Sequence, residues 1–552
     1  MARHFVNLDA LIPREDFDVE DDAAISYKTG GNLKLSEIES SGLVFQTLRK
    51  PDFQRETSNW TPEKIVELVR GFVDGDLIPA IIMWWSPKSS NIFVIDGAHR
   101  LSALLAWVHD DYGDRNISTA FFRNSIPPEQ ERAAQEARTL IKTTIGSYQL
   151  LKSAAQNHDF ADKTQELRAK NAGLLPIELQ WVKGSARKAE ASFFTINQSA
   201  TAIHETELRI IKARRKPNAV AARAIIHAGT GHKYWSEFPL ETQREVERLS
   251  RDIYGILFDP SLETPIKTLD LPVAGSGYSA DSLSLTFDFV NFASNYRPEM
   301  WMEPKPNSRR AKNPRPVLPD DVDGSGTIQS LRAVRSIASM ISGDAPKSLG
   351  LHPVVYFYGA TGRYQPAAFL ATAALVRELD QSNAFPAFTE ARERFEEFIL
   401  RFGYFKNQIV GSYGSGTRSL DPLLTFFKIA LTGIQQGMAE SEIIDSLLSE
   451  PRLRLQEKNE EDRTSRRNFT SQSKSAAFLR AAIDGAVRCG ICRARVHIKA
   501  ISIDHIIRKQ DGGSGDIENA QPTHPYCNTG YKEMLNSRAR KVQGLADHAA
   551  EL

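Results

Sequence analysis

Apolar residues recur at helical spacing along most of the chain, but two short stretches near the N-terminus break that pattern. Thr61 and Pro62 supply a helix cap and a first helical residue, and apolar positions recur every three or four residues over 65–73. Two apolar runs, 78–85 and 91–95, have the length of strands. Helical spacing returns in four later segments: 328–341, 367–379, 389–402 and 419–448. The pattern predicts mixed α and β structure near the N-terminus and a largely helical middle.

The composition is that of an ordinary globular protein with more than one domain. The chain has 552 residues, of which 41% are hydrophobic and 25% charged. This length suggests roughly three or four domains. No apolar run is long and uninterrupted enough to cross a bilayer, and the N-terminus lacks the apolar segment of a secretion signal. We therefore expect a cytoplasmic protein without a membrane anchor.

Charge is distributed unevenly along the chain. The net charge is +1, yet residues 451–552 contain 18 Lys and Arg against 12 Asp and Glu, a net charge of +6. The rest of the chain is therefore acidic, with a net charge of −5. A basic C-terminal region suits a polyanionic partner such as nucleic acid, although solvated charged helices have a similar composition.

Two pairs of metal ligands lie near the C-terminus. Cys489 and Cys492 form a C-x-x-C, and His524 and Cys527 form an H-x-x-C after a gap typical of paired zinc knuckles. Three thiols and one imidazole suit a tetrahedral zinc ion. The only three cysteines of the chain are in this set, which argues against disulfides and for a reducing compartment. Because so short a segment buries little core, we expect the zinc to be structural.

Between and after these ligand pairs lie side chains suited to hydrolysing a phosphodiester. An imidazole titrates near the working pH, so His505 can take a proton from water. Asp504 and Asn528 offer hard oxygen ligands of the kind that Mg²⁺ or Mn²⁺ prefers, and such a cation acts as a Lewis acid. Lys532 lies four residues after Asn528. On a helix the two side chains would share a face, from which Lys532 can contact a phosphate.

This order of residues, together with the Gly512-Gly513 turn and Asn519, resembles the HNH (ββα-metal) nuclease family. The resemblance implies a metal-dependent endonuclease in which His505 is the general base. It also implies that Asp504 and Asn528 bind the catalytic metal and that Asn519 steadies the loop carrying the histidine. The alternative is a degenerate finger that keeps zinc and binds DNA without cutting it.

A second candidate site lies at a strand-to-helix turn in the N-terminal third of the chain. The strand at 91–95 is followed by Asp96, Gly97, Ala98, His99 and Arg100, which lead into a helix. Backbone amides at the start of a helix can bind an anion. Arg100 adds a bidentate phosphate donor, and His99 a donor that depends on pH. The simpler interpretation is an ordinary turn in which Asp96 caps the helix.

Several segments follow the order seen in ParB/sulfiredoxin-like domains of the GmrSD and SspE type. They are Pro51–Arg55, Trp60–Lys64, Ile78-Pro79, Asp96–Arg100 and Phe193–Gln198. The resemblance implies an α/β domain that binds or hydrolyses a nucleotide, with ATP and GTP as candidates, or that senses nucleic acid. The residues it implies in binding or sensing are Arg55, Asp96, Gly97, His99, Arg100 and Asn197.

Together these features predict a multidomain α+β protein with a ParB-like α/β domain, a largely helical middle and a C-terminal zinc-stabilised ββα-metal finger. Segment 297–327 is rich in Pro, Asp and Gly, as in a linker, and 354–358 suits a buried strand or the start of a helix. The predicted boundaries are 1–42 for a polar arm, 43–230 for the ParB-like sensor or NTPase domain, 231–326 for a helical extension and linker, 327–449 for a helical domain, 450–477 for a charged tether, 478–540 for the HNH domain and 541–552 for a tail.

The resemblances together favour an HNH DNA endonuclease that an N-terminal ParB-like domain gates and that restricts foreign DNA, such as phage DNA. Two alternatives remain open. One is a non-catalytic ParB-like DNA-binding protein with a zinc finger, and the other is a stand-alone site-specific restriction endonuclease. The sequence does not decide between a monomer and a homo-oligomer, or between a nick and a double-strand break.

Overall fold

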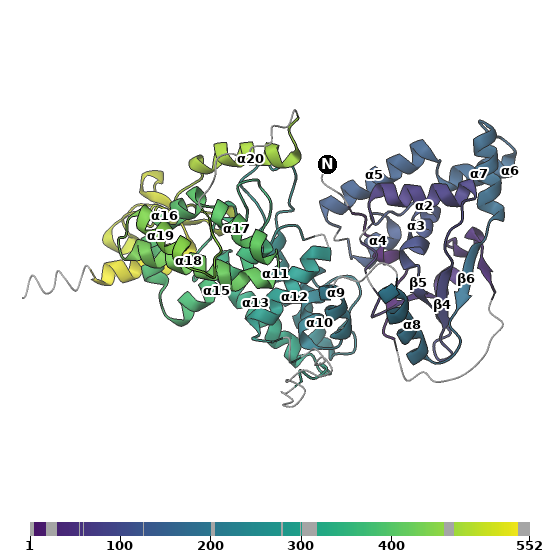
Figure 1. Cartoon of the computed structure of the whole chain (residues 1–552), viewed down its shortest axis with the longest axis horizontal. Helices are drawn as coiled ribbons and strands as arrows, with labels where there is room; N and C mark the ends of the chain where they lie inside the picture. The colour runs from purple at the N-terminus through teal and green to yellow at the C-terminus, as the bar shows by residue number, and fades with distance from the viewer. Residues whose placement is uncertain are drawn as a thin grey trace, which may run out of the picture.

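The computed structural model describes residues 5–17, 30–54, 56–58, 60–124, 126–199, 205–277, 280–297, 300, 317–456 and 468–538. Figure 1 shows two lobes, an N-terminal lobe built around a sheet and a larger helical lobe. The C-terminal module, drawn in yellow, lies at the end of the helical lobe that faces away from the sheet. The two candidate sites predicted above are therefore on opposite sides of the molecule.

The N-terminal lobe contains a six-stranded sheet in the order β1-β3-β5-β4-β6-β2. Pairs β1/β3, β3/β5 and β4/β6 are parallel, whereas β4/β5 and β2/β6 are antiparallel. The strands are β1 (Arg14–Glu15), β2 (Asn32–Leu33), β3 (Leu48–Pro51), β4 (Ile81–Trp85), β5 (Ile92–Asp96) and β6 (Ile177–Trp181). The strands predicted at 78–85 and 91–95 are thus confirmed as β4 and β5.

Helices cover both faces of this sheet. Side chains alternate between the faces along each strand, and β4 and β5 carry apolar side chains on both faces. Met83 and Val94 point into the core beneath most of the helices, whereas Trp84 and Phe93 pack on the opposite face against α8 (Ala186–Ser199). The helices of the lobe before α8 are α1 (Leu43–Thr47), α2 (Pro62–Asp74), α3 (Ala98–His109), α4 (Asn116–Phe121), α5 (Pro128–Thr144), α6 (Tyr148–Asn157) and α7 (Lys163–Leu174). The helix predicted after Thr61 is confirmed as α2, which ends at Gly75 with a φ of +87°.

The first residues of the chain differ from the polar arm predicted over 1–42. Within the described residues, the side chains of Val6, Leu8 and Ile12 are fully buried in the lobe, and β1 and β2 form the two edges of its sheet. The segment looked polar because its buried core includes Asp9, which is held by Arg14 and Lys50. Strands of two residues are also too short to produce a readable alternation.

The helical lobe has one continuous apolar core that extends from Ile210 to Ile483 and crosses the boundary predicted near 327. Segment 354–358 begins as a short helix, α14, and forms no strand of a sheet. The helices of the lobe are α9 (Glu205–Lys212), α10 (Pro217–Ile226), α11 (Leu240–Phe258), α12 (Ala280–Ala293), α13 (Ser325–Ile341), α14 (Pro353–Tyr356), α15 (Pro366–Gln381), α16 (Phe385–Arg401), α17 (Tyr404–Tyr413), α18 (Leu420–Gln435), α19 (Glu440–Ser449) and α20 (Ser471–Ala482).

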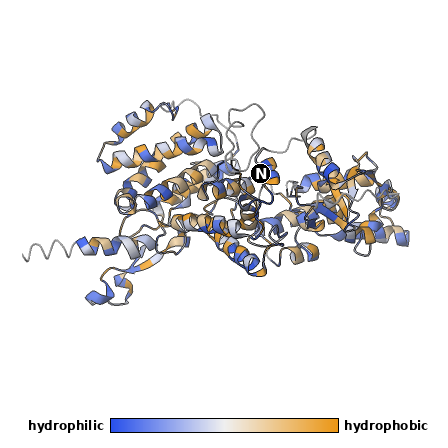
Figure 2. Ribbon diagram, turned by 90° about the horizontal axis from the view of Figure 1, so that it is seen from below, coloured by the Kyte–Doolittle hydropathy of each residue, from blue (hydrophilic) through white to orange (hydrophobic). Residues whose placement is uncertain are grey.

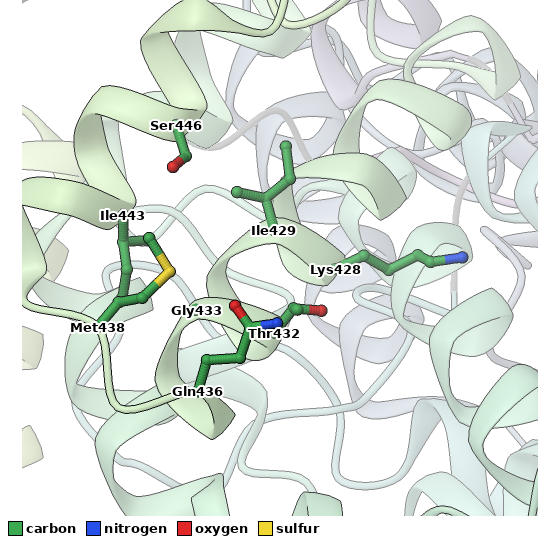
Figure 3. A pocket seen from close by; sticks show the side chains of 8 residues that line it. All are labelled: Lys428, Ile429, Thr432, Gly433, Gln436, Met438, Ile443 and Ser446. Atoms are coloured by element: carbon green, nitrogen blue, oxygen red, sulfur yellow. The ribbon is translucent and has the colours of Figure 1, made fainter.

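Polar and apolar residues alternate along the helices, as Figure 2 shows by hydropathy. Among the described helices, none has the length and apolar character needed to cross a membrane. A pocket of about 280 Å³ lies between α18 and α19 (Figure 3). Its lining includes the apolar Ile429, Met438 and Ile443 and only one ionisable side chain, Lys428. This pocket therefore lacks the clustered ionisable groups that a hydrolytic site needs.

Candidate active site and metal centre

The C-terminal module is a β-hairpin followed by a helical segment. Strand β7 (Ser502–His505) pairs with β8 (Ala520–Thr523) in antiparallel register, with Asp504 opposite Gln521. A π-helical turn, Cys527–Tyr531, follows β8, and helical residues continue to 538. This is the ββα order that the sequence predicts for 478–540, and it places the Asp-His pair at the end of the first strand.

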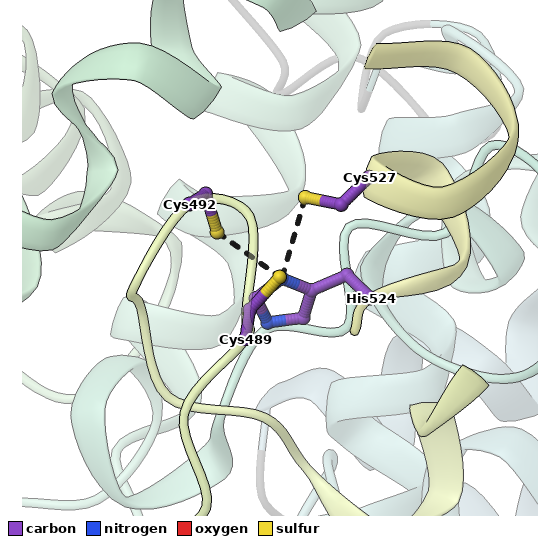
Figure 4. Close-up of side chains that lie close together, drawn as sticks. All are labelled: Cys489, Cys492, His524 and Cys527. Atoms are coloured by element: carbon purple, nitrogen blue, oxygen red, sulfur yellow. Dashed lines mark hydrogen bonds between the residues drawn. The ribbon is translucent and has the colours of Figure 1, made fainter. Parts of the chain in front are cut away.

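The four predicted zinc ligands lie together and are all buried (Figure 4). Their ligand atoms are all within 4.8 Å of one another. The Nδ1 atom of His524 is 3.4 Å from the Cys492 sulfur and 3.6 Å from the Cys527 sulfur. The other ring nitrogen of His524, Nε2, is 3.0 Å from the Arg495 carbonyl oxygen. A hydrogen bond donated to that carbonyl fixes the tautomer that leaves Nδ1 for a metal.

Burial and mutual hydrogen bonds shift the pKa values of the four side chains in this cluster. Burial lowers the pKa of His524, so its ring is neutral, the form that binds metal. Hydrogen bonds from the Cys492 and Cys527 thiols to the Cys489 sulfur lower the pKa of Cys489 strongly and raise the pKa values of Cys492 and Cys527, so Cys489 is the thiol that most readily becomes a thiolate. Three sulfurs and one imidazole nitrogen at these positions match a structural tetrahedral zinc site.

The metal centre is seated on the helical lobe through buried charges. The Arg495 amide donates to a carboxylate oxygen of Glu396 on α16 at 3.0 Å, and its guanidinium pairs with Glu397 at 2.9 Å. Glu396 also pairs with Arg392 at 2.7 Å, and the Arg392 guanidinium donates to the Leu349 carbonyl. Neither Arg392 nor Glu396 is reached by solvent to more than 1%. The module is therefore packed against α16 and held there by these contacts.

In the predicted catalytic pair, Asp504 is buried and His505 is half-buried. The amide of Gln521 donates to Asp504 Oδ2 at 3.0 Å. The ammonium of Lys532 contacts both Asp504 oxygens, at 2.9 and 2.7 Å, and also the His505 backbone carbonyl. The structure thus places Lys532 on the predicted metal ligand, whereas the sequence suggested a contact with phosphate.

Asn519 ties the loop after β7 to the segment before β8. Its side-chain oxygen accepts the Ile507 amide at 2.7 Å, and its nitrogen donates to the carbonyls of Ile507 and Ser514 at 3.0 and 2.6 Å. A Cβ atom on Gly513 would lie 1.9 Å from the Ile507 carbonyl oxygen, so only glycine fits there. These contacts hold the loop that follows His505 in place.

Asn528 lies on the π-helical turn, and its amide nitrogen donates to the Ser502 hydroxyl at 2.8 Å. That bond uses the nitrogen and leaves the amide oxygen as the atom suited to a hard cation. Asn528 and Lys532 thus contact Ser502 and Asp504, two alternate residues of β7 whose side chains share one face of the strand. Sequence reasoning missed Ser502 and Gln521. Each contacts a residue far from it in the chain, Asn528 and Asp504 respectively, and no local sequence pattern indicates these contacts.

The second candidate site is assembled at the turn between β5 and α3. Gly97 has a φ of +89°, a conformation that side-chain-bearing residues rarely adopt. Arg100 donates to Asp96 at 2.7 Å and to the Pro79 carbonyl at 2.8 Å. The His99 ring stacks on Trp60 with centroids 5.7 Å apart. Arg55 lies outside the described residues, as does the side chain of Asn197.

The loop that follows β3 links this lobe to the helical lobe through two ion pairs. Asp52 accepts from Arg214 at 2.9 Å, and Glu56 lies 3.0 Å from Nε2 of His227. Arg214 and His227 flank α10, and the two carboxylates lie in one short loop. These partners are 162 and 171 residues apart in the chain, so no local sequence signal points to them.

The C-terminal module has the features of a ββα-metal nuclease: a β-hairpin with an Asp-His pair, a following helical segment and a Cys₃His cluster. Comparison with protein families agrees: residues 489–533 match HNH endonuclease, and residues 35–214 match the family described as GmrSD restriction endonuclease, N-terminal domain. No curated protein and no solved structure matches the chain. The chain is therefore an endonuclease of restriction type, and its substrate is DNA.

Proposed function

We propose that this protein is a metal-dependent HNH DNA endonuclease that its N-terminal domain gates, and that it restricts foreign DNA such as phage DNA. The observation that carries the proposal is that β7 ends in the Asp504-His505 pair and is contacted by Asn528 through Ser502, in a module that also holds a buried Cys₃His cluster. A DNA-binding finger would need the cluster but would have no use for a base beside two hard oxygen ligands.

In the proposed reaction, His505 takes a proton from the water that attacks the phosphorus atom. Asp504 and Asn528 would hold Mg²⁺ or Mn²⁺, which would supply charge stabilisation at the phosphate. Gln521 fixes the rotamer of Asp504, and Ser502 fixes that of Asn528. Asn519 holds the loop that follows His505. Zinc held by Cys489, Cys492, His524 and Cys527 would keep the hairpin and the helical segment in register.

The proposed gate begins at the β3 loop and reaches the nuclease module through two helices. Asp52 and Glu56 pair with residues at the two ends of α10, which is buried from Pro217 to Ile225. At its N-terminal end α10 meets the start of α13, because Pro217 lies close to Gly326. Helix α13 is roughly 25 Å long and ends beside Ser342, whose hydroxyl is 3.3 Å from Nδ1 of His497 in the nuclease module.

The main apolar cores of the two lobes are separate, and Ile211 of α9 joins the smaller cluster beneath α8. Ion pairs such as Asp52–Arg214, Glu56–His227 and Arg132–Glu263 join the lobes, and polar interfaces between domains permit relative motion. We propose that a nucleotide such as ATP or GTP, or a chemical modification of DNA, is sensed near Asp96, Gly97, His99 and Arg100, with Arg55 and Asn197 as further candidates. The ligand would move the adjacent β3 loop and, with it, α10.

The activity is tested with purified protein on supercoiled plasmid and on modified phage DNA, each with Mg²⁺ or EDTA and with or without ATP or GTP. We expect cleavage that needs Mg²⁺ and that changes with DNA modification or nucleotide. Zinc-dependent binding without cleavage of any substrate would favour a non-catalytic DNA-binding protein. Cleavage at fixed sites that ignores nucleotide and modification would favour a stand-alone restriction enzyme.

Glu56→Gln is expected to uncouple the gate while leaving the nuclease module intact. The substitution removes the charge that pairs with His227, so the ratio of cleavage rates with and without the activating ligand should fall about fivefold or more, the lower range of allosteric couplings. The matched control is Glu263→Gln, which removes another pair between the lobes, with Arg132, away from α10. An unchanged ratio in Glu56→Gln would exclude this route.

The same pair predicts a pH dependence of the coupling. Burial lowers the pKa of His227, but the Glu56 carboxylate outweighs it and the pKa lies above its ordinary 6.5. The stabilisation is therefore complete below pH 6.5 and is lost as pH rises through the raised pKa. In wild-type protein, we expect the ratio of cleavage rates with and without ligand to fall as the pH rises through the pKa of His227. In Glu56→Gln the ratio should stay low and flat over the same range, and a parallel fall there would contradict the assignment to this pair.

A further inference from the structure

The ammonium of Lys532 is held in a nest of oxygen atoms at the hydrolytic centre. It contacts both carboxylate oxygens of Asp504 and the backbone carbonyl of His505. The side chains of Lys532 and Asp504 are only 14% and 7% exposed. Carboxylate and carbonyl oxygens are the ligands that a hard divalent cation prefers. The lysine therefore fills the kind of oxygen environment that the catalytic cation requires.

An ammonium and a divalent cation on Asp504 repel each other, because the carboxylate is buried and screening by solvent is weak there. Gln521 offers a neutral partner that keeps Asp504 in place whichever cation is bound, since its amide donates to Oδ2 at 3.0 Å. Lys532 has a flexible four-carbon stem and a compact charge, so it can leave the carboxylate without moving the backbone.

We propose that Lys532 is an internal cation that competes with the catalytic divalent ion for Asp504, and that binding of the ion releases the lysine toward the scissile phosphate. This inference rests on the proposed nuclease function. Lys532 then has two successive roles: it neutralises Asp504 in the resting protein, and it pairs with the substrate in the loaded one. It is a positioning residue in the first state and touches substrate in the second.

The competition has a signature that a purely structural lysine lacks. Removing the ammonium should strengthen binding of the divalent ion and, at saturating ion, weaken cleavage. A lysine that only stabilised the fold would weaken both when removed, and one that only bound phosphate would leave ion binding unchanged. The affinity for Mn²⁺ and the cleavage rate must therefore change in opposite directions.

The test measures Mn²⁺ binding by electron paramagnetic resonance in full-length, zinc-loaded protein carrying His505→Ala, so that no turnover occurs. Adding Lys532→Met, which keeps the length of the side chain, is expected to lower the dissociation constant about tenfold. Asp504→Asn identifies the site by removing the binding. The charge-matched control is Lys509→Met, which removes an exposed lysine of the same module and should leave the dissociation constant unchanged.

Lys532→Arg keeps a cation on Asp504 and provides the second variant, in case the methionine protein folds poorly. It is expected to bind Mn²⁺ at least as weakly as the parent. Equal or weaker Mn²⁺ binding in folded Lys532→Met, or a tightening in Lys532→Arg, would overturn the competition. These outcomes are independent of cleavage: a wild-type protein that cuts no DNA refutes the proposed function, whereas an unchanged Mn²⁺ affinity refutes only the role of Lys532.

Discussion

His505→Ala is expected to reduce DNA cleavage by roughly 10²–10⁴-fold, the range that general-base catalysis contributes, and to leave the fold intact. His505 is half-buried at the end of β7. Its strand pairing uses backbone atoms, which alanine retains, and the zinc ligands and the Asn519 contacts involve other side chains. The loss should therefore appear in turnover with little change in melting temperature. The measurement is the single-turnover nicking rate on supercoiled plasmid at saturating Mg²⁺.

The control for this prediction is His158→Ala, which removes an exposed histidine of the N-terminal lobe and should cut normally. Zinc content and the melting temperature are measured on both variants, so that a misfolded module is not mistaken for a missing base. Cleavage by His505→Ala at the wild-type rate would refute the mechanism, even if the zinc site were fully occupied.

Local spacing was sufficient to predict the Cys₃His cluster of the C-terminal module. The C-x-x-C and H-x-x-C pairs meet because each pair spans a single turn and a short hairpin joins them. Helices with a clear apolar stripe, such as α2 and α13, were predicted for the same reason: local packing geometry repeats every three to four residues. In these cases sequence separation and spatial separation are both small.

Long-range partners could not be predicted from one sequence. Lys532 lies four residues after Asn528, which suggested a shared helical face, yet its ammonium goes to Asp504, 28 residues earlier. Glu396 receives the Arg495 amide from 99 residues away. A charged residue on a predicted helix is normally assigned to solvent. The hydrophobic pattern of the sequence therefore does not indicate that Arg392 and Glu396 are buried beneath the metal centre. Such contacts are fixed by tertiary packing alone.

These long-range contacts change the physical picture of the nuclease module. A charged segment ahead of it suggested a finger on a tether, yet α20 packs Leu479 into the helical core and Ser475 accepts the Ile266 amide at 2.9 Å. Tyr526, next to the ligand Cys527, packs edge-on against Phe385 of α16 with centroids 5.3 Å apart. A gate acting on a seated module can work through small shifts of α13 and α16, without a large swing of the finger.

Cys492→Ala is expected to release the zinc ion and unfold the C-terminal module. Structural zinc contributes about 10–16 kcal/mol of apparent binding free energy in small zinc domains. The apolar cluster of the metal centre is small, with Cys489, Ala494, Val496 and Cys527 as the other buried members, so it cannot replace that contribution. Expected results are a zinc content near zero and loss of amide-exchange protection over 487–533.

The loss should spread to the part of α16 that carries the docking charges. Without the module, Glu396 loses the Arg495 amide, and the pair with Arg392 is left facing a cavity. Amide-exchange protection at this end of α16 should therefore fall as well. The N-terminal lobe has its own core and should keep its protection. The matched control is Arg493→Ala, which changes the exposed residue beside Cys492 and should retain zinc. Full zinc content and native protection in Cys492→Ala would show that the cluster does not hold the module together.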